Sequence, residues 1–329
     1  MYGEGVERVL GAWTNREHVF ALALILFILA WPLDRRHVFL TEHSFITGAY
    51  TEAGTLALYA SDLAFVLLWV AWLWYARGKS LGTIVPRGAL WAGLAFVGWA
   101  AFRAFPVGVP IGTGSALLGW YGAARIGQGF LLTLITAYAW NSSRLRNVIL
   151  WTLVAAGFLQ SLLGIGQVLR GTDFGLRFLG EHPLSLQLPG VAKVDITTQN
   201  NQLSNVPVET GFKTPNDVPV GTKVLRAYGT FPHPNVLASF LLASLSASLA
   251  LSFRKGGTLE TSLHFLTVPI GTVSAGLVAT FSRAAWVSMM LMLGSAWVFH
   301  HGNSSSYRNI TGWRRILAPM VVGILLMLL

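Results

Sequence analysis

Four polar side chains that could do chemistry lie close together in the segment LRAYGTFPHPNVLASFL, residues 225–241. They are Arg226, Tyr228, His233 and Asn235. Pro234 suits the first turn of a following apolar helix, because its missing N–H would have no partner there. The amides of Asn235 and Val236 are then predicted to face outward, as a helix start that attracts anions. The segment therefore predicts polar chemistry, suited to an anion, where a loop turns into an apolar helix.

Three arginines are the candidate anion-binding groups. Arginine is the natural cation for phosphate, because its planar guanidinium grips two oxygens and keeps its charge. Arg283 lies at the junction of two long apolar stretches, Arg226 precedes the loop–helix junction, and Arg125 lies in GWYGAARIGQG at the end of another apolar stretch. The alternatives are snorkelling to lipid headgroups for Arg283 and Arg125, and ordinary solvation for Arg226.

His233 is the candidate general base, because histidine changes protonation near neutral pH. The alternative is a loop histidine that packs against the helix start and fixes the turn. His182, in GEHP, has a similar or weaker claim.

Composition places these residues in a membrane protein. Of 329 residues, 53% are hydrophobic and only 11% are charged, and the apolar residues come in blocks near the length of about 20 that crosses a hydrocarbon core. The formal net charge of +10 does not indicate nucleic-acid binding, because a basic stripe with interleaved aromatic residues is missing. The absence of cysteine excludes disulfides, thiolate metal sites and cysteine nucleophiles.

The hydropathy pattern predicts an all-α polytopic bundle of about nine transmembrane helices with one small extracytoplasmic loop insert. Residues 1–169 form a bundle of five spans, residues 170–231 form the partly β insert, and residues 232–329 begin a second bundle. The predicted spans are 19–33, 55–75, 89–105, 128–140, 148–169, 234–253, 263–281, 284–299 and 316–329. A cytoplasmic N-terminus puts most of the basic residues of the short connections inside, which is the usual orientation.

Three runs carry a resemblance. In chain order, GVAKVD, KVLRAYGTFPHPNVLASFL and TFSRAAWVSMM resemble the O-antigen ligase and polymerase superfamily of bacterial membrane glycosyltransferases. Supporting features are Asp62 in SDLAFVLLW, and Gln160 and Gln167 in LQSLLGIGQVL. The resemblance covers most of residues 55–329.

The resemblance implies transfer of a glycan from undecaprenyl pyrophosphate to the hydroxyl of a lipid or protein acceptor, on the outer face of the bacterial cytoplasmic membrane. It implies no metal and no other cofactor, and Arg283 matches the arginine expected to face the lipid pyrophosphate. The sequence agrees, since it has no HExxH motif, no paired-carboxylate motif and no Gly-rich phosphate loop. Family members continue with further spans and a second outer loop that carries a histidine, so we expect this sequence to correspond to an N-terminal portion.

Structural roles are expected for the polar residues inside the apolar stretches. Asp62 is expected to satisfy backbone amides or a neighbouring arginine, and Gln160 and Gln167 are expected to share a helix face with Gly164 that packs inside the bundle. Two functional alternatives stay open. One is a secondary transporter whose pathway is lined by Asp62, Arg125 and Gln160, and the other is a non-catalytic subunit of a polysaccharide assembly complex.

Overall fold

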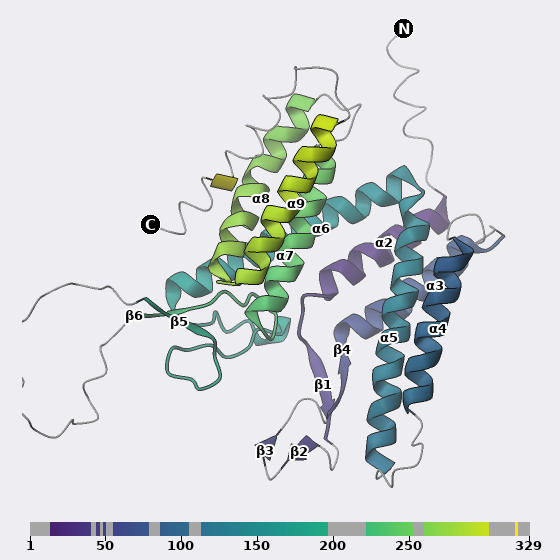
Figure 1. The fold of residues 1–329 in the computed structure, drawn as a ribbon, viewed down its shortest axis with the longest axis horizontal. Helices are drawn as coiled ribbons and strands as arrows, with labels where there is room; N and C mark the ends of the chain where they lie inside the picture. Colours follow the sequence, from purple (N-terminus) through teal and green to yellow (C-terminus); the bar gives the residue numbers. More distant parts are fainter. Residues whose placement is uncertain are drawn as a thin grey trace, which may run out of the picture. The chain divides into compact units, whose positions relative to one another are not determined.

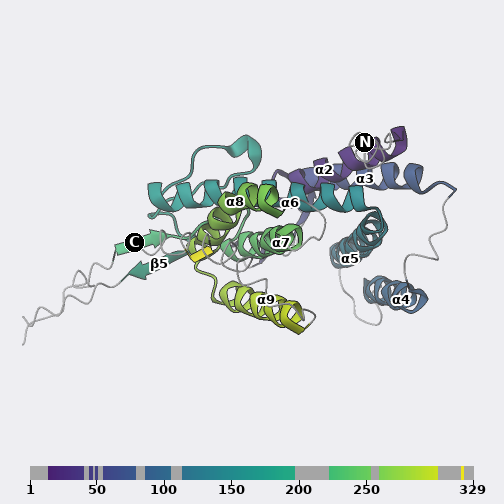
Figure 2. The same cartoon turned by 90° about the horizontal axis from the view of Figure 1, so that it is seen from above.

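The computed structural model describes residues 14–40, 44–46, 49–50, 55–78, 86–104, 113–196, 222–252, 259–302 and 320–321. Within them lie eight α-helices and three two-stranded antiparallel sheets (Figures 1 and 2). The chain divides into two compact units, residues 1–156 and 157–329, and the boundary falls inside helix α6 (Ser143–Arg170).

The first unit is built from two helix pairs. Its helices are α2 (Asn15–Ala30), α3 (Ala60–Ala76), α4 (Arg87–Ala104) and α5 (Thr113–Trp140). Figures 1 and 2 show α2 beside α3 and α4 beside α5. Aromatic rings hold the first pair together, with Phe20 stacked on Tyr75 at 5.0 Å between centroids and Phe27 edge-on to Phe65 at 6.1 Å.

A short hairpin leads into α3. Strand β1 (Arg36–Phe39) pairs with β4 (Leu56–Tyr59), and the small β2 (Phe45–Ile46) and β3 (Ala49–Tyr50) pair with each other. Strand β4 passes directly into α3, where the carboxylate of Asp62 accepts a hydrogen bond from the Tyr59 N–H at 2.8 Å. This capping contact fixes the strand-to-helix corner, and so fixes where Asp62 points.

The second unit packs its helices through small residues. It contains the end of α6 with α7 (Pro234–Ser252), α8 (Leu259–Ala279) and α9 (Arg283–Gly302). A Cβ at Gly276 of α8 would lie 2.7 Å from the Ser161 Cβ of α6, and a Cβ at Gly157 of α6 would overlap Ser244 of α7. Such close backbone approach through Gly and Ser is typical of helices that associate in membranes.

The polar segment between α6 and α7 is partly β, as predicted. After the 3-10 turn η4 (Arg177–Leu179), strands β5 (Lys193–Ile196) and β6 (Thr222–Leu225) pair antiparallel. Strand β5 forms the end of VAKVDI, residues 191–196, and β6 forms the start of TKVLRAYGTF, residues 222–231.

The prediction of about nine transmembrane helices is wrong. Only α6 and α7 are long and apolar enough to cross a membrane among the residues described. Helix α3 and the apolar stretch Phe265–Ala279 of α8 are shorter than this length. The predicted span 55–75 includes strand β4 near its start. Helices α2 and α3 have 16 and 17 residues, fewer than the roughly 20 that a hydrocarbon core requires, and hydropathy does not show where a helix begins and ends. The span predicted at 316–329 lies outside the described residues except for Met320 and Val321.

Candidate functional site

The polar segment that precedes α7 rests on one face of α6. Gln167 accepts hydrogen bonds at its Oε1 from the N–H groups of Tyr228 and Gly229, at 3.2 and 2.8 Å, and its Nε2 donates to the Gly229 carbonyl at 2.8 Å. Two turns earlier, Gln160 accepts from the Thr230 N–H at 3.0 Å. All these groups are buried, so the two glutamines supply the hydrogen-bond partners that the buried backbone N–H and C=O groups of the segment need.

Two glycines allow this close approach. A Cβ at Gly164, between the glutamines on α6, would lie 3.1 Å from the Ala227 Cβ. Gly229 has φ +60°, and a Cβ there would overlap the Gln160 amide oxygen. The expected structural role of Gln160 and Gln167 is therefore confirmed.

Arg226 ties this segment to the start of α7 and to the turn that follows α8. Its Nε donates to the Thr280 carbonyl at 2.7 Å, and its Nη2 donates to the Asn235 Oδ1 at 2.9 Å. The Ala227 N–H donates to the Ala279 carbonyl at 2.9 Å, beside it. Burial lowers the pKa of Arg226 from its usual value, yet an arginine stays charged at neutral pH. A half-buried cation thus stands between the start of α7 and the corner between α8 and α9.

The corner between α8 and α9 has an unusual backbone. Phe281 has φ +49°, which is rare for a bulky residue and costs about 1–2 kcal/mol. The turn redirects the chain so that α9 begins at Arg283, three residues after the carbonyl that Arg226 holds. Arg283 is exposed, and the described part of the chain offers its guanidinium no hydrogen bond or ion pair.

His233 caps α7. Its Nδ1 accepts from the Asn235 N–H at 3.2 Å, and its carbonyl accepts from the Val236 N–H at 3.0 Å. The prediction that these two amides face outward is therefore wrong, because His233 satisfies both. An accepting Nδ1 puts the proton of the neutral ring on Nε2, so this arrangement favours the turn-fixing role over that of a base.

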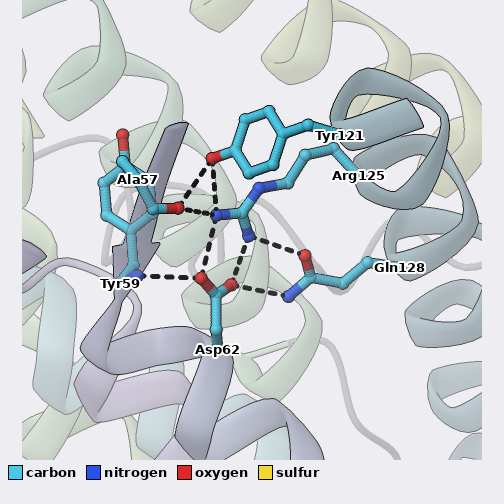
Figure 3. A network of polar contacts seen from close by, with 6 residues as sticks. All are labelled: Ala57, Tyr59, Asp62, Tyr121, Arg125 and Gln128. Carbon is cyan, nitrogen blue, oxygen red and sulfur yellow. Dashed lines mark hydrogen bonds and ion pairs between the residues drawn. The ribbon is translucent and has the colours of Figure 1, made fainter. Parts of the chain in front are cut away.

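Arg125 lies in the first unit, inside a partly buried polar network (Figure 3). Its guanidinium forms a two-pronged ion pair with Asp62, and it donates to the Ala57 carbonyl, the Tyr121 hydroxyl and the Gln128 Oε1, each at 2.8 Å. The expectation that Asp62 satisfies a backbone amide and a neighbouring arginine is confirmed. Asp62 and Arg125 thus bind each other, with 13% of the aspartate side chain and 31% of the arginine side chain exposed.

The network also sets the charge of Asp62. Burial alone would raise the pKa of this carboxyl, but hydrogen bonds from Arg125, the Tyr59 N–H and Gln128, together with the arginine charge, outweigh burial and hold the pKa below its usual range. Asp62 is therefore ionised at neutral pH, and Arg125 has a permanent partner.

Of the predicted site residues, the second unit brings together Arg226, His233 and the helix that starts with Arg283. Two hydrogen bonds were not predicted from the sequence: the one from Arg226 to the Asn235 side chain and the one from Arg226 to the Thr280 carbonyl. The first involves residues only nine positions apart across a predicted turn, whereas the second joins positions 54 apart that no local pattern connects.

No protein-family model, no curated protein and no solved structure matches this chain.

Proposed function

We propose that this chain binds a lipid-linked pyrophosphate and takes part in transferring its glycan to an acceptor hydroxyl, as a ligase or polymerase of bacterial cell-envelope glycans. The observation that carries the proposal is the bond from Arg226 to the Thr280 carbonyl, three residues before Arg283. Three residues span at most about 11 Å even when extended. The side chains of Arg226 and Arg283 therefore lie near the same corner, between α8 and α9. Arg283 has no hydrogen-bond partner in the described part of the chain.

Glycan transfer from a pyrophosphate requires cations at the leaving group. The acceptor oxygen attacks the anomeric carbon, the bond from that carbon to the pyrophosphate oxygen breaks, and its electron pair stays on the departing pyrophosphate. The hydroxyl proton passes to a base, for which His233 would have to give up its bond to the Asn235 N–H. Arg226 and Arg283 would hold the leaving group as its charge grows.

We place this reaction at the outer face of the bacterial cytoplasmic membrane. Helices α6 and α7 support a membrane location, because both are long and apolar enough to cross. Arg144 and Arg146 at the start of α6, and Arg254 and Lys255 after α7, support a cytoplasmic position for these two helix ends, and with it an outer position for the segment between the helices.

The test is binding of undecaprenyl pyrophosphate to the full chain in lipid nanodiscs. Arg283→Ala should weaken binding about tenfold to a hundredfold, the usual value of one charge-assisted contact. Arg283→Lys should recover only part of the affinity, because lysine lacks the two-pronged grip. Arg87→Ala, which removes an exposed arginine at the start of α4, is the matched control and should bind normally.

Equal binding by the two Arg283 variants and the parent chain would remove this arginine from the site. Binding that does not distinguish undecaprenyl pyrophosphate from undecaprenol would overturn the proposed function.

A further inference from the structure

The loop that follows α6 exposes large apolar side chains. Leu169 at the end of α6 is 79% exposed, Phe178 in η4 is 70% exposed, and Phe174 between them is 43% exposed. These residues lie within ten positions of one another. Several exposed apolar side chains that form one patch typically mark a surface that contacts a partner or a membrane.

The loop is nevertheless folded, because its two carboxylates are directed at its own backbone. Asp173 accepts from the N–H groups of Gly175 and Leu184 at 3.0 and 2.8 Å. Glu181, which is buried, accepts from the N–H groups of Phe174 and Leu176 at 2.9 and 2.7 Å, and from the Gln167 amide at 2.8 Å. The negative charges of the loop are thus engaged within it.

The exposed charges of the same stretch are positive. Arg170 is exposed, and its guanidinium lies 5.4 Å from the centre of the Phe174 ring. Arg177 is exposed and adjoins Phe178. The stretch 169–178 therefore presents three apolar side chains and two cations outward, while both carboxylates, at positions 173 and 181, bind backbone N–H groups.

Helix α6 places this stretch at a defined level. No charged residue occurs between Arg146 and Arg170, a run of 23 residues. In a helix this run is about 35 Å long, close to the thickness of about 30 Å of a hydrocarbon core. If α6 crosses a bilayer, Arg170 stands where the helix leaves the hydrocarbon, which is where aromatic and basic side chains accumulate.

We propose that residues 169–178 dock on the surface of an anionic lipid bilayer, with Leu169, Phe174 and Phe178 in the acyl boundary and Arg170 and Arg177 on lipid phosphates. Charge complementarity and continuity with α6 favour a bilayer over a protein partner. The proposal is independent of glycan transfer. It needs only that α6 crosses the membrane.

The chain contains no cysteine, so one introduced thiol can be labelled selectively. Phe178→Cys in the full chain is labelled with an environment-sensitive fluorophore and reconstituted into phosphatidylcholine vesicles containing about a third phosphatidylglycerol. We expect strong quenching by a lipid with a nitroxide near the headgroup end of the acyl chain, and weak quenching by one with the nitroxide at the chain end. Gln187→Cys, an exposed polar position beyond η4, is the control and should be quenched by neither.

The charge contribution is tested by Arg177→Gln in the Phe178→Cys background. One cation near an anionic surface changes binding about fivefold. The ratio of label embedded in the bilayer to label exposed to water should therefore fall by about that factor. In vesicles of phosphatidylcholine alone, the loss of the arginine should have little effect. Lys223→Gln, which removes an exposed cation from β6, should leave the ratio unchanged.

Equal, weak quenching at positions 178 and 187 would overturn the proposal. So would a label at 178 that is shielded from water but not quenched by lipid, because this result would assign the surface to a protein partner. Neither outcome bears on the binding of undecaprenyl pyrophosphate, so the two proposals fail separately.

Discussion

At the scale of single residues, Arg125 and Arg226 have opposite roles. Arg125 is bonded to five oxygen atoms of four residues, one of them a carboxylate that remains ionised. Among the residues that the structure describes, the oxygens bonded to Arg226 are uncharged, one a carbonyl and one an amide. A guanidinium whose charge has no counter-ion is the better anion site, which is why the proposed function uses Arg226 with Arg283 and not Arg125.

The Asp62–Arg125 pair makes the first prediction. Because the pKa of Asp62 is lowered in the folded chain, its contribution to stability is present above the unfolded pKa and is lost as the pH falls through the folded pKa. Asp62→Asn should therefore lower the unfolding midpoint at pH 7, at a cost of about 1–3 kcal/mol for a partly exposed pair. In thermal unfolding, the gap between parent and variant should be full at pH 7 and should shrink as the pH falls below the unfolded pKa of Asp62 toward its lowered folded pKa. A gap that stays constant below the unfolded pKa would contradict the role of the carboxylate charge.

Gly229 makes the second prediction. Gly229→Ala meets both an unfavourable φ and the Gln160 amide oxygen, whereas Gly190→Ala meets only an unfavourable φ, since nothing lies within 4 Å of its Cβ position. We expect about 1 kcal/mol of destabilisation at Gly190 and clearly more at Gly229, measured by chemical unfolding. Loss of undecaprenyl pyrophosphate binding should accompany only Gly229→Ala. Equal effects of the two substitutions would show that Gln160 gives way freely.

At the scale of elements, α6 is a platform for the segment between β6 and α7. Gln160 and Gln167 were predictable as one helix face, because a spacing of seven returns to the same side of a helix. What that face holds was not predictable, since its partners are backbone groups more than 60 positions away. The span count was wrong for a related reason. Local hydropathy finds the apolar stretch 55–75, but it does not show that a strand occupies residues 56–59 and leaves α3 only 17 residues long.

The platform makes the third prediction. Gln167→Leu leaves the buried N–H groups of Tyr228 and Gly229 without an acceptor, and each such group costs about 1–3 kcal/mol. Hydrogen exchange of these two amides should accelerate by about tenfold or more, while that of α9 should change little. Gln187→Leu, at an exposed position, is the control. Unchanged exchange at Tyr228 and Gly229 would show that the segment is held by other contacts.

At the scale of the whole molecule, the proposals depend on two helices. The chain is predominantly helical in its described part, and α6 and α7 are the helices there with the length and composition to cross a membrane. The segment between them contains Arg226 and His233. Its first residues belong to the stretch 169–178. If both helices cross, that whole segment lies on one side of the membrane, and the connection after α7 lies on the other.

Reporter fusions give the last prediction. Alkaline phosphatase folds only outside the cytoplasm, so a fusion after residue 200 should be active and a fusion after residue 257 should be inactive. A fluorescent protein that matures only in the cytoplasm should give the reverse pattern at the same two positions. The reverse pattern for the phosphatase would place the segment inside, where the basic connections were expected. The same phosphatase activity at both positions would show that α7 does not cross, and would leave Arg226 and Arg283 without the membrane face on which a lipid pyrophosphate is presented.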